Sequence, residues 1–249
     1  MEKIAWGEVL SGSGVRRALE RQRRSSETMA IKAVLFDIDG TLVDSNDLHV
    51  TAWQAVFRQI GATFDDQVVH DQIGKGTDML VPTLLPDIDE AEQERLGEAH
   101  GSIFKSQYLE QVTPFAAARD LLARVKESGR QVVLASSASS DELDHHLDLL
   151  DAREIVDLST TSDDVEKTKP APDIFAAALE KLSPLDASEV IVVGDTPYDI
   201  EAAAKCGIAA VGVRSGKFSD ETLKDAGAVA LYDDVAALLA GFENSPLNG

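Results

Sequence analysis

One short strand and the two acids that follow it constrain the fold of this chain more than any other feature. Residues 31–36 form an apolar run rich in β-branched and aromatic side chains, closed by a Gly-Thr turn, which is typical of a buried strand in a parallel sheet. Asp37 and Asp39 come next, and alternate residues of an extended chain point to the same side. Ligands of open α/β sheets bind beyond the carboxyl ends of the strands, so the two acids lie where a site is expected.

The paired acids need a physical explanation. Two carboxylates buried side by side repel each other unless a cation compensates them or one of them holds a proton. Either arrangement indicates a functional site rather than a purely structural turn. Acids are also common in turns, so the pair alone allows a turn with no further role. The later motifs of the chain decide between these interpretations.

After Pro114 the hydrophobic pattern alternates between helical and extended segments. Such alternation indicates an α/β fold whose parallel sheet has helices on both faces. The expected strands cover about residues 131–136, 155–158, 190–193 and 209–213, and a last strand and helix lie near 228–240. The expected helices cover about residues 115–128, 139–150 and 172–182, and a fourth one ends at Lys205.

The stretch between the first two strands of the sheet shows only helical patterns, at about residues 46–60, 65–72, 76–85 and 88–111. Roughly 70 residues is too long for an ordinary crossover connection. We therefore predict an inserted all-helical cap over residues 46–113. The core would then consist of residues 30–45 and 114–249.

Residues 1–29 differ from the rest of the chain. They carry six basic and four acidic side chains and no apolar central region, which does not fit a signal peptide, and their acids do not fit a transit peptide. We expect a loosely ordered N-terminal extension, and whether it belongs to the mature protein is open. A functional basic tail is the alternative.

Composition excludes some classes of partner. The formal net charge of −21 argues against nucleic acid, whose phosphates are bound by basic surfaces. The longest apolar runs are too short to cross a bilayer, so no membrane partner is expected. The single Cys206 cannot form an internal disulfide and fits a reducing cytoplasm, where we expect the protein as a monomer or a homodimer.

Four motifs occur in a fixed order at the ends of expected strands or at the start of a helix. They are Asp37-x-Asp39-Gly40-Thr41, Ser136, Lys169-Pro170-Ala171-Pro172 and Gly194-Asp195-x-x-x-Asp199. In this order they resemble the motifs of the haloacid dehalogenase-like superfamily, which consists mostly of phosphohydrolases. The resemblance covers about residues 31–240 and implies a Rossmann-like core with a helical cap inserted between the first two motifs.

The cap and its His49-x-x-x-Trp53 are similar to those of the branch that contains phosphoglycolate phosphatase and β-phosphoglucomutase. The resemblance implies that Asp37, ionised at pH 7, is a nucleophile that forms an aspartyl-phosphate. Asp39 would protonate the leaving alkoxide and then take a proton from water. To act first as an acid it must have a raised pKa, which the second carboxylate nearby can supply.

An anionic nucleophile approaches an anionic phosphate only if positive charge is present. Mg²⁺ prefers hard oxygen ligands. The resemblance implies that Asp37, the backbone carbonyl of Asp39, Asp195 and Asp199 hold Mg²⁺, the last directly or through water. Lys169 would neutralise the nucleophile and one phosphoryl oxygen. Lys167, its neighbour, lacks the Pro-Ala-Pro context.

Other candidates are less specific. Ser136 is the preferred donor to a phosphoryl oxygen, with Ser137 as the alternative, because both lie at the end of one strand. His49 could reach the site from the cap, or it could be packed in the cap's core. Lys75 lies in a Gly-Lys-Gly turn that matches the family's substrate-selecting region and is a candidate anion contact. The remaining histidines lack the spacing of metal ligands and are expected on the surface: His70, His100, His145 and His146.

Taken together, the motifs predict a Mg²⁺-dependent phosphatase of the haloacid dehalogenase-like type that hydrolyses a small metabolite such as phosphoglycolate or a sugar phosphate. A phosphosugar mutase of the β-phosphoglucomutase type would use the same acids and remains an alternative. A catalytically silent binding module is a more remote one. Dehalogenation is disfavoured, because that branch lacks the second acid that this chain has as Asp39.

Overall fold

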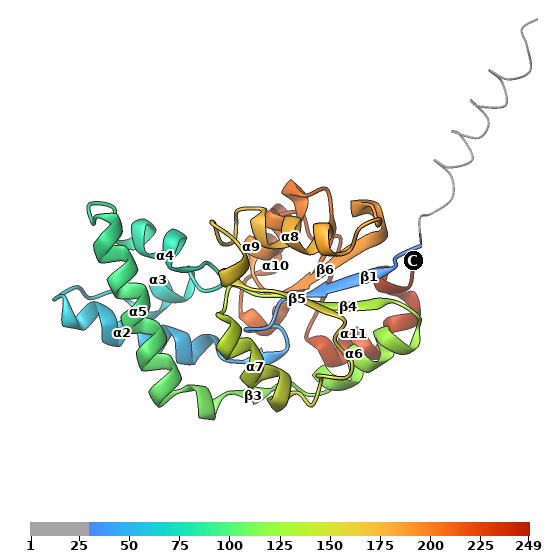
Figure 1. Cartoon of the computed structure of the whole chain (residues 1–249), viewed down its shortest axis with the longest axis horizontal. Helices are drawn as coiled ribbons and strands as arrows, with labels where there is room; N and C mark the ends of the chain where they lie inside the picture. Colours follow the sequence, from blue (N-terminus) through green and yellow to red (C-terminus); the bar gives the residue numbers. More distant parts are fainter. Residues whose placement is uncertain (1–29) are drawn as a thin grey trace, which may run out of the picture.

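A computed structural model describes residues 30–249, so the extension predicted for residues 1–29 lies outside the described part of the chain. Figure 1 shows a sheet between two layers of helices, with a separate group of helices at one end. The expected α/β class is therefore confirmed. Among the helices of residues 30–249, none combines the length and apolar character that crossing a membrane requires.

The sheet has six parallel strands in the order β5-β4-β1-β6-β7-β8. Its central strand β1 pairs with β4 on one side and β6 on the other. Phe36, the last residue of β1, lies opposite Leu134 and Val193, so the three strands end at the same edge of the sheet. The strands are β1 (Ala33–Phe36), β4 (Gln131–Ala135), β5 (Leu158–Thr160), β6 (Val190–Gly194), β7 (Ala209–Val213) and β8 (Ala230–Tyr232).

Side chains of β1 alternate between two apolar cores, one on each face of the sheet. Val34 and Phe36 pack in one core, and Ala33 and Leu35 pack in the other. Full burial of a large apolar side chain contributes about 1.5–3 kcal/mol, so both layers of helices are held mainly by such contacts. One layer contains α6 (Ala118–Glu127), α7 (Ser140–Leu149) and α11 (Val235–Ala240), and the other contains α8 (Asp173–Lys181), α9 (Pro197–Lys205) and α10 (Asp220–Asp225).

Four helices form the group at the end of the sheet (Figure 1). They have an apolar core of their own, which includes Trp53, Phe57 and Leu80. The chain enters and leaves this helical block through β2 (Val43–Asp44) and β3 (Thr113–Pro114), which pair antiparallel and so hold the two connections side by side. The helices are α2 (Asn46–Gln59), α3 (Asp66–His70), α4 (Thr77–Leu84) and α5 (Glu90–Gln107).

The structure differs from the sequence prediction in several elements, among them the short strands β2 and β3, which were not predicted. The strand expected at residues 155–158 lies at β5, because Ile155 and Val156 pack against the core outside the sheet and pairing with β4 begins only at Leu158. Helix α5 ends at Gln107, where the prediction ran on to residue 111. Helix α10 was not predicted. Single-turn 3-10 helices cover Leu109–Gln111, Ser162–Asp164, Ala187–Glu189, Arg214–Gly216, Phe242–Asn244 and Pro246–Asn248.

Candidate active site

A buried ion pair lies at the carboxyl edge of the sheet. Asp37 follows β1 directly, and its Oδ1 accepts a hydrogen bond of 2.5 Å from Lys169 Nζ. The same ammonium donates to the carbonyl oxygen of Ala135 at 2.9 Å and lies 2.7 Å from Asp199 Oδ1. Asp37 is 7% exposed and Lys169 is 1% exposed. Lysine is almost never this buried without an anionic partner, and here it has two.

Two further acids reach the same point from the end of β6 and the start of α9. Asp195 Oδ1 accepts a hydrogen bond from Thr41 Oγ1 at 2.9 Å, and its Oδ2 accepts one from Asn46 Nδ2 at 3.0 Å. Asp199 Oδ2 accepts from both the backbone N–H and the hydroxyl of Thr196, which forms a capping box at the start of α9. The predicted acids of the last motif therefore face Asp37.

Three carboxylates and one ammonium share this buried volume, so negative charge is in excess. Burial raises the pKa of Asp37 to about 7, with further increases from Asp199 and Asp39, although Lys169 opposes the shift. Burial, together with Asp37 and Asp199, also holds the pKa of Asp195 well above its usual value. Burial lowers the pKa of Lys169, but its two acidic partners raise it by more and keep the ammonium charged.

The acid cluster fits a hard divalent cation. Asp37, Asp195 and Asp199 can each offer a carboxylate oxygen so that the three atoms lie within 4.8 Å of one another. Oxygen ligands suit Mg²⁺, and a cation would compensate the excess negative charge. Backbone packs directly on Asp195, since a Cβ atom at Gly40 would lie 2.2 Å from Asp195 Oδ2 and one at Gly216 only 2.0 Å from it. The carboxylate of Asp39 is not part of this group.

Asp39 faces the other side of the site. Its Oδ1 accepts a hydrogen bond of 2.6 Å from Ser45 Oγ and lies 3.3 Å from His49 Nε2. Burial raises the pKa of Asp39, but the hydrogen bond and charge of His49, with smaller contributions from His146 and Ser45, hold it below its usual range. The shifts of the two pKa values are therefore opposite to those expected from the sequence: burial and the other acids raise the pKa of Asp37, while the imidazole partners of Asp39 lower its pKa.

His49 belongs to a stack of rings on the helical block. Its ring lies parallel to Phe104 with 3.8 Å between centroids, and its Nδ1 lies 3.4 Å from His100 Nε2. His100 in turn stacks on Trp53 at 4.3 Å. Burial lowers the pKa of His100 well below its usual value. The stacked rings hold the His49 side chain next to the carboxylate of Asp39.

Two histidines predicted on the surface are buried, which corrects that expectation. His146 is fully buried, and His70 is 7% exposed with its ring against Phe218. His100 and His145 are both of intermediate exposure, and His100 lines the cavity described below. Helical spacing in the sequence could have indicated this burial. His146 shares a helical face with the buried Leu143 and Leu150, as His100 does with Leu96 and Phe104.

A cavity of about 260 Å³ lies between the core and the helical block, next to the buried acid cluster. Both strand-end acids open into it, as do the two candidate serines of the second motif. Ser136 is 1% exposed, and its Oγ accepts a hydrogen bond of 3.0 Å from the backbone N–H of Ala138. Ser137 Oγ donates to the carbonyl oxygen of Gly74 at 3.3 Å. The lining includes Asp37, Asp39, His49, Trp53, Lys75, His100, Lys105, Ser136, Ser137 and Ser139.

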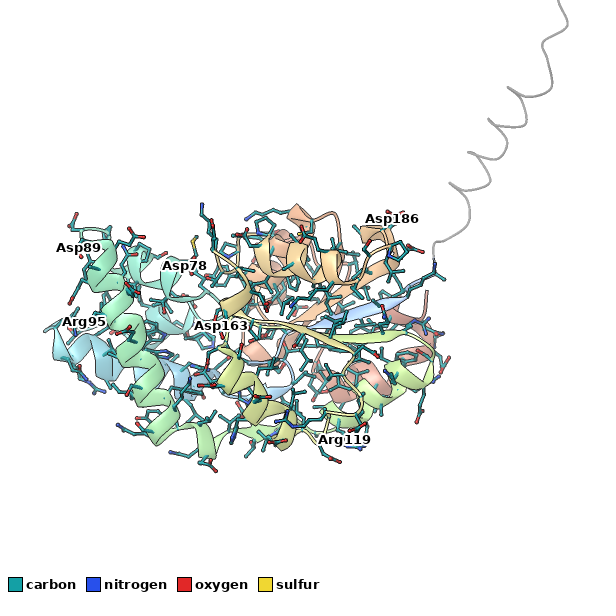
Figure 2. The ribbon with its side chains drawn as sticks, viewed as in Figure 1. Asp78, Asp89, Arg95, Arg119, Asp163 and Asp186 are labelled. Carbon is teal, nitrogen blue, oxygen red and sulfur yellow. The ribbon has the colours of Figure 1, made fainter. Side chains whose placement is uncertain are left out.

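The turn that carries Lys75 is docked on the core. Gly76 N–H donates to Thr168 Oγ1 at 2.8 Å, and Thr168 N–H donates to Asp78 Oδ2 at 3.1 Å. Figure 2 shows Asp78 where the helical block meets the core. Lys75 Nζ donates to Gln72 Oε1 at 2.6 Å and lies 4.5 Å from the centroid of the Tyr198 ring, and burial lowers its pKa.

Several residues of the site were not predicted. Thr41 and Asn46 donate hydrogen bonds to Asp195, and Ser45 donates one to Asp39. Thr168, which directly precedes Lys169, accepts a hydrogen bond from the turn that carries Lys75. Small polar residues such as these have no distinctive pattern, because the same residue types cap helices and form turns. Adjacency to the motifs was the available signal, since Ser45 and Asn46 lie just beyond the first motif and Thr168 just before Lys169.

A family model described as haloacid dehalogenase-like hydrolase matches residues 34–213. The chain is 30% identical to a putative pyrophosphatase PpaX from Caldanaerobacter subterraneus, over 79% of this chain and 87% of that protein. It is 29% identical to a phosphorylated carbohydrates phosphatase from Thermotoga maritima, over 81% of this chain and 94% of that protein.

Two further matches show the extent of the similarity. A hydrolase from Pseudomonas syringae of known crystal structure is 29% identical, with a TM-score of 0.80 that covers 86% of this chain and 98% of that one. The chain is also 30% identical to the chloroplast protein SUPPRESSOR OF QUENCHING 1 from Arabidopsis thaliana. That match covers 82% of this chain and 20% of the plant protein, so the chain spans about a fifth of this longer relative.

Proposed function

The chain belongs to the haloacid dehalogenase-like hydrolase family, and on that basis we propose that it is a Mg²⁺-dependent phosphatase of a small phosphorylated metabolite. The observation that carries the proposal is the buried contact of Asp37 with Lys169, beside Asp195. Asp37 also lines a cavity, together with Asp39. Phosphate monoesters hydrolyse extremely slowly without catalysis, so an enzyme gains by dividing the reaction into two steps.

In the first step, an oxygen of Asp37 attacks phosphorus and the bond from phosphorus to the leaving oxygen breaks. Lys169 neutralises charge on the nucleophile, which it already contacts at 2.5 Å, and on a phosphoryl oxygen. Asp39 gives a proton to the leaving alkoxide. Because the pKa of Asp39 lies below its usual range owing to the hydrogen bond and charge of His49, that imidazole is the group placed to hand it this proton.

In the second step, water attacks the phosphorus of the aspartyl-phosphate and the bond from phosphorus to Asp37 breaks. Asp39 takes a proton from this water, for which it must be ionised, and its lowered pKa keeps it so. Ser136 lines the same cavity and is placed to donate to a phosphoryl oxygen. The second step releases inorganic phosphate and restores Asp37.

Mg²⁺ would be held by the carboxylates of Asp37, Asp195 and Asp199 and by the backbone carbonyl of Asp39. When bound, it supplies positive charge that offsets the charge of both the nucleophile and the phosphoryl group. Thr41 and Asn46 keep Asp195 oriented toward Asp37 by their two hydrogen bonds. Asp199 also fixes the position of the lysine ammonium.

We propose that residues 46–113 act as a cap that selects the substrate. Ring side chains of the helical block and hydroxyl groups of the core line the cavity, together with Lys75 and Lys105. A cavity of about 260 Å³ admits a small polar ester, and this lining suits the hydroxyl groups of a sugar phosphate or the carboxylate of phosphoglycolate. The Thermotoga maritima relative, which is named a phosphorylated carbohydrates phosphatase, supports this substrate class.

The test is a measurement of phosphate release from purified protein with Mg²⁺, over sugar phosphates, phosphoglycolate, pyrophosphate and nucleotides. We expect turnover of at least one small ester and none after Asp37→Asn. Activity that appears only as isomerisation of a sugar phosphate, with dependence on a bisphosphate activator, would replace the phosphatase proposal by a mutase. Binding of esters without any turnover would contradict both.

A further inference from the structure

His146 is a buried imidazole that the proposed mechanism does not use. It lies on the inner face of α7, is fully buried, and its Nε2 is 3.8 Å from Asp39 Oδ1. That distance is too long for a hydrogen bond. Among the described residues, neither ring nitrogen of His146 has a hydrogen-bond partner. A polar group buried in this way destabilises the protein unless it gains a partner in some state of the molecule.

The groups around His146 leave Asp39 as the acceptor that it can reach. The charged or titratable side chains that act on it are Asp39, His49, His145 and Glu142. Glu142 Oε2 already accepts two hydrogen bonds of 3.0 Å, from the backbone N–H and the hydroxyl of Ser139. Burial lowers the pKa of His146, so the ring is neutral and carries one N–H donor.

We propose that His146 is a positioning residue for Asp39, to which its Nε2–H donates when the carboxylate turns from Ser45 and His49 toward the leaving group. A shift of Asp39 by about 1 Å closes the gap to hydrogen-bond distance. The inference rests on the proposed phosphatase function. It assigns Asp39 Oδ1 two alternative sets of donors: Ser45 and His49, which lie at 2.6 and 3.3 Å in the structure, and His146, which lies at 3.8 Å and bonds after the shift.

The two imidazoles near Asp39 belong to different parts of the molecule. His49 lies on α2 of the helical block, whereas His146 lies on α7 of the core, next to the strand that ends at Ser136. An acid that must release a proton and later recover one needs one oxygen held while the other reacts. A donor from the core holds that oxygen at a fixed place relative to Asp37, independently of the helical block.

The test uses two variants of nearly equal size. His146→Gln keeps an N–H donor, and His146→Met removes it. Each is compared with the wild type by kcat/KM, which reports the enzyme phosphorylation step, for an alkyl phosphate that the wild type hydrolyses and for para-nitrophenyl phosphate. The nitrophenolate leaving group is weakly basic and needs little help from an acid. His145→Met, one residue away and partly exposed, is the matched control.

We expect His146→Met to lower kcat/KM for the alkyl phosphate roughly 10- to 100-fold, as loss of a group that orients a catalytic residue does. Its effect on para-nitrophenyl phosphate should be less than about threefold, because that step depends little on the acid. His146→Gln should recover most of the loss, and His145→Met should match the wild type. The Tm of His146→Met should equal or exceed that of the wild type, because an unpartnered polar group is removed.

Unchanged kcat/KM in His146→Met, or equal losses on both esters, would overturn the inference and leave the phosphatase function intact. If His146→Met does not fold, His146→Leu is judged by the same ratio of the two esters. A wild-type protein without phosphatase activity would overturn the proposed function and this inference with it.

Discussion

Lys169 Nζ lies 2.5 Å from Asp37 Oδ1, and both groups are buried at the point where three strands of the sheet end. The two residues are 132 positions apart in the chain. The same contact serves stability and the proposed catalysis, because either charge buried here without its partner would strongly destabilise the fold. Substitution of each charged group should therefore have its own effect on activity and stability.

Asp37→Asn should reduce phosphate release to below a few per cent of the wild-type rate, because an amide cannot act as the nucleophile. The fold should persist, since Asn has almost the same size and Asp199 still pairs with Lys169. Initial rates and circular dichroism measure the two effects. Substantial residual turnover in a folded variant would exclude Asp37 as the nucleophile.

Lys169→Met should lose both activity and stability. Removal of one partner from a buried ion pair costs about 3–5 kcal/mol, and the acids left behind repel one another. The exposed neighbour provides the control, and Lys167→Met should leave both quantities close to those of the wild type. Chemical denaturation and phosphate release are the measurements. Equal behaviour of the two variants would show that Lys169 has no special role.

Mg²⁺ should stabilise the protein against unfolding. A ligand that binds only the folded state at 100 times its Kd adds about 2.7 kcal/mol, and Asp195→Asn should abolish most of that gain. Thermal shifts with and without Mg²⁺ measure this in the absence of substrate. EDTA should silence turnover and added Mg²⁺ should restore it, whereas undiminished rates in EDTA would remove the metal from the mechanism.

The affinity for Mg²⁺ should fall at low pH. Burial raises the pKa of Asp37 to about 7, so below this pH a proton occupies a carboxylate that the cation needs. The protonated fraction of this carboxylate increases as pH decreases, so the apparent affinity for Mg²⁺ should be roughly tenfold weaker at pH 6 than at pH 8. Calorimetric titration with Mg²⁺ at several pH values tests whether the affinity falls as pH decreases. A constant affinity over that range would contradict the raised pKa.

Asp78→Ala should raise the KM for substrate with a smaller effect on kcat. Asp78 accepts hydrogen bonds from the backbone and the hydroxyl of Thr168 and so fixes the turn that carries Lys75. Hydrogen bonds to a charged group contribute about 1.5–3 kcal/mol, which corresponds to a KM change of roughly 10- to 100-fold. Asp89→Ala, which removes only the N-cap of α5, should leave KM unchanged (both residues are labelled in Figure 2).

Much of the fold could be predicted because it follows from local patterns. The strand before Asp37, the regular alternation after Pro114 and the helical stretch between them each have a periodicity that one sequence displays. Helix α10 was missed because it is only six residues long and mostly polar, with Leu223 as its buried residue. Strand β5 was predicted a few residues too early because an edge strand of only three residues, Leu158–Thr160, is too short to show the usual β pattern.

The candidate site was predicted only where motifs mark it. Asp37, Lys169, Asp195 and Asp199 were named from sequence and lie together in the structure. The surroundings of Asp39 could not be predicted, because its pKa depends on contacts with His49 on α2 and His146 on α7 that no local pattern encodes. These contacts shift the pKa of Asp39 downward, opposite to the direction expected from the sequence.

The most direct test of the account is detection of the covalent intermediate. Protein mixed with substrate and Mg²⁺ would be quenched in acid, digested and examined by mass spectrometry for a peptide that carries one added phosphoryl group. The account predicts that group on Asp37, with its loss after hydroxylamine treatment and its absence in Asp37→Asn. Phosphate release with no phosphorylated peptide under single-turnover conditions, or a phosphoryl group on another residue, would contradict it.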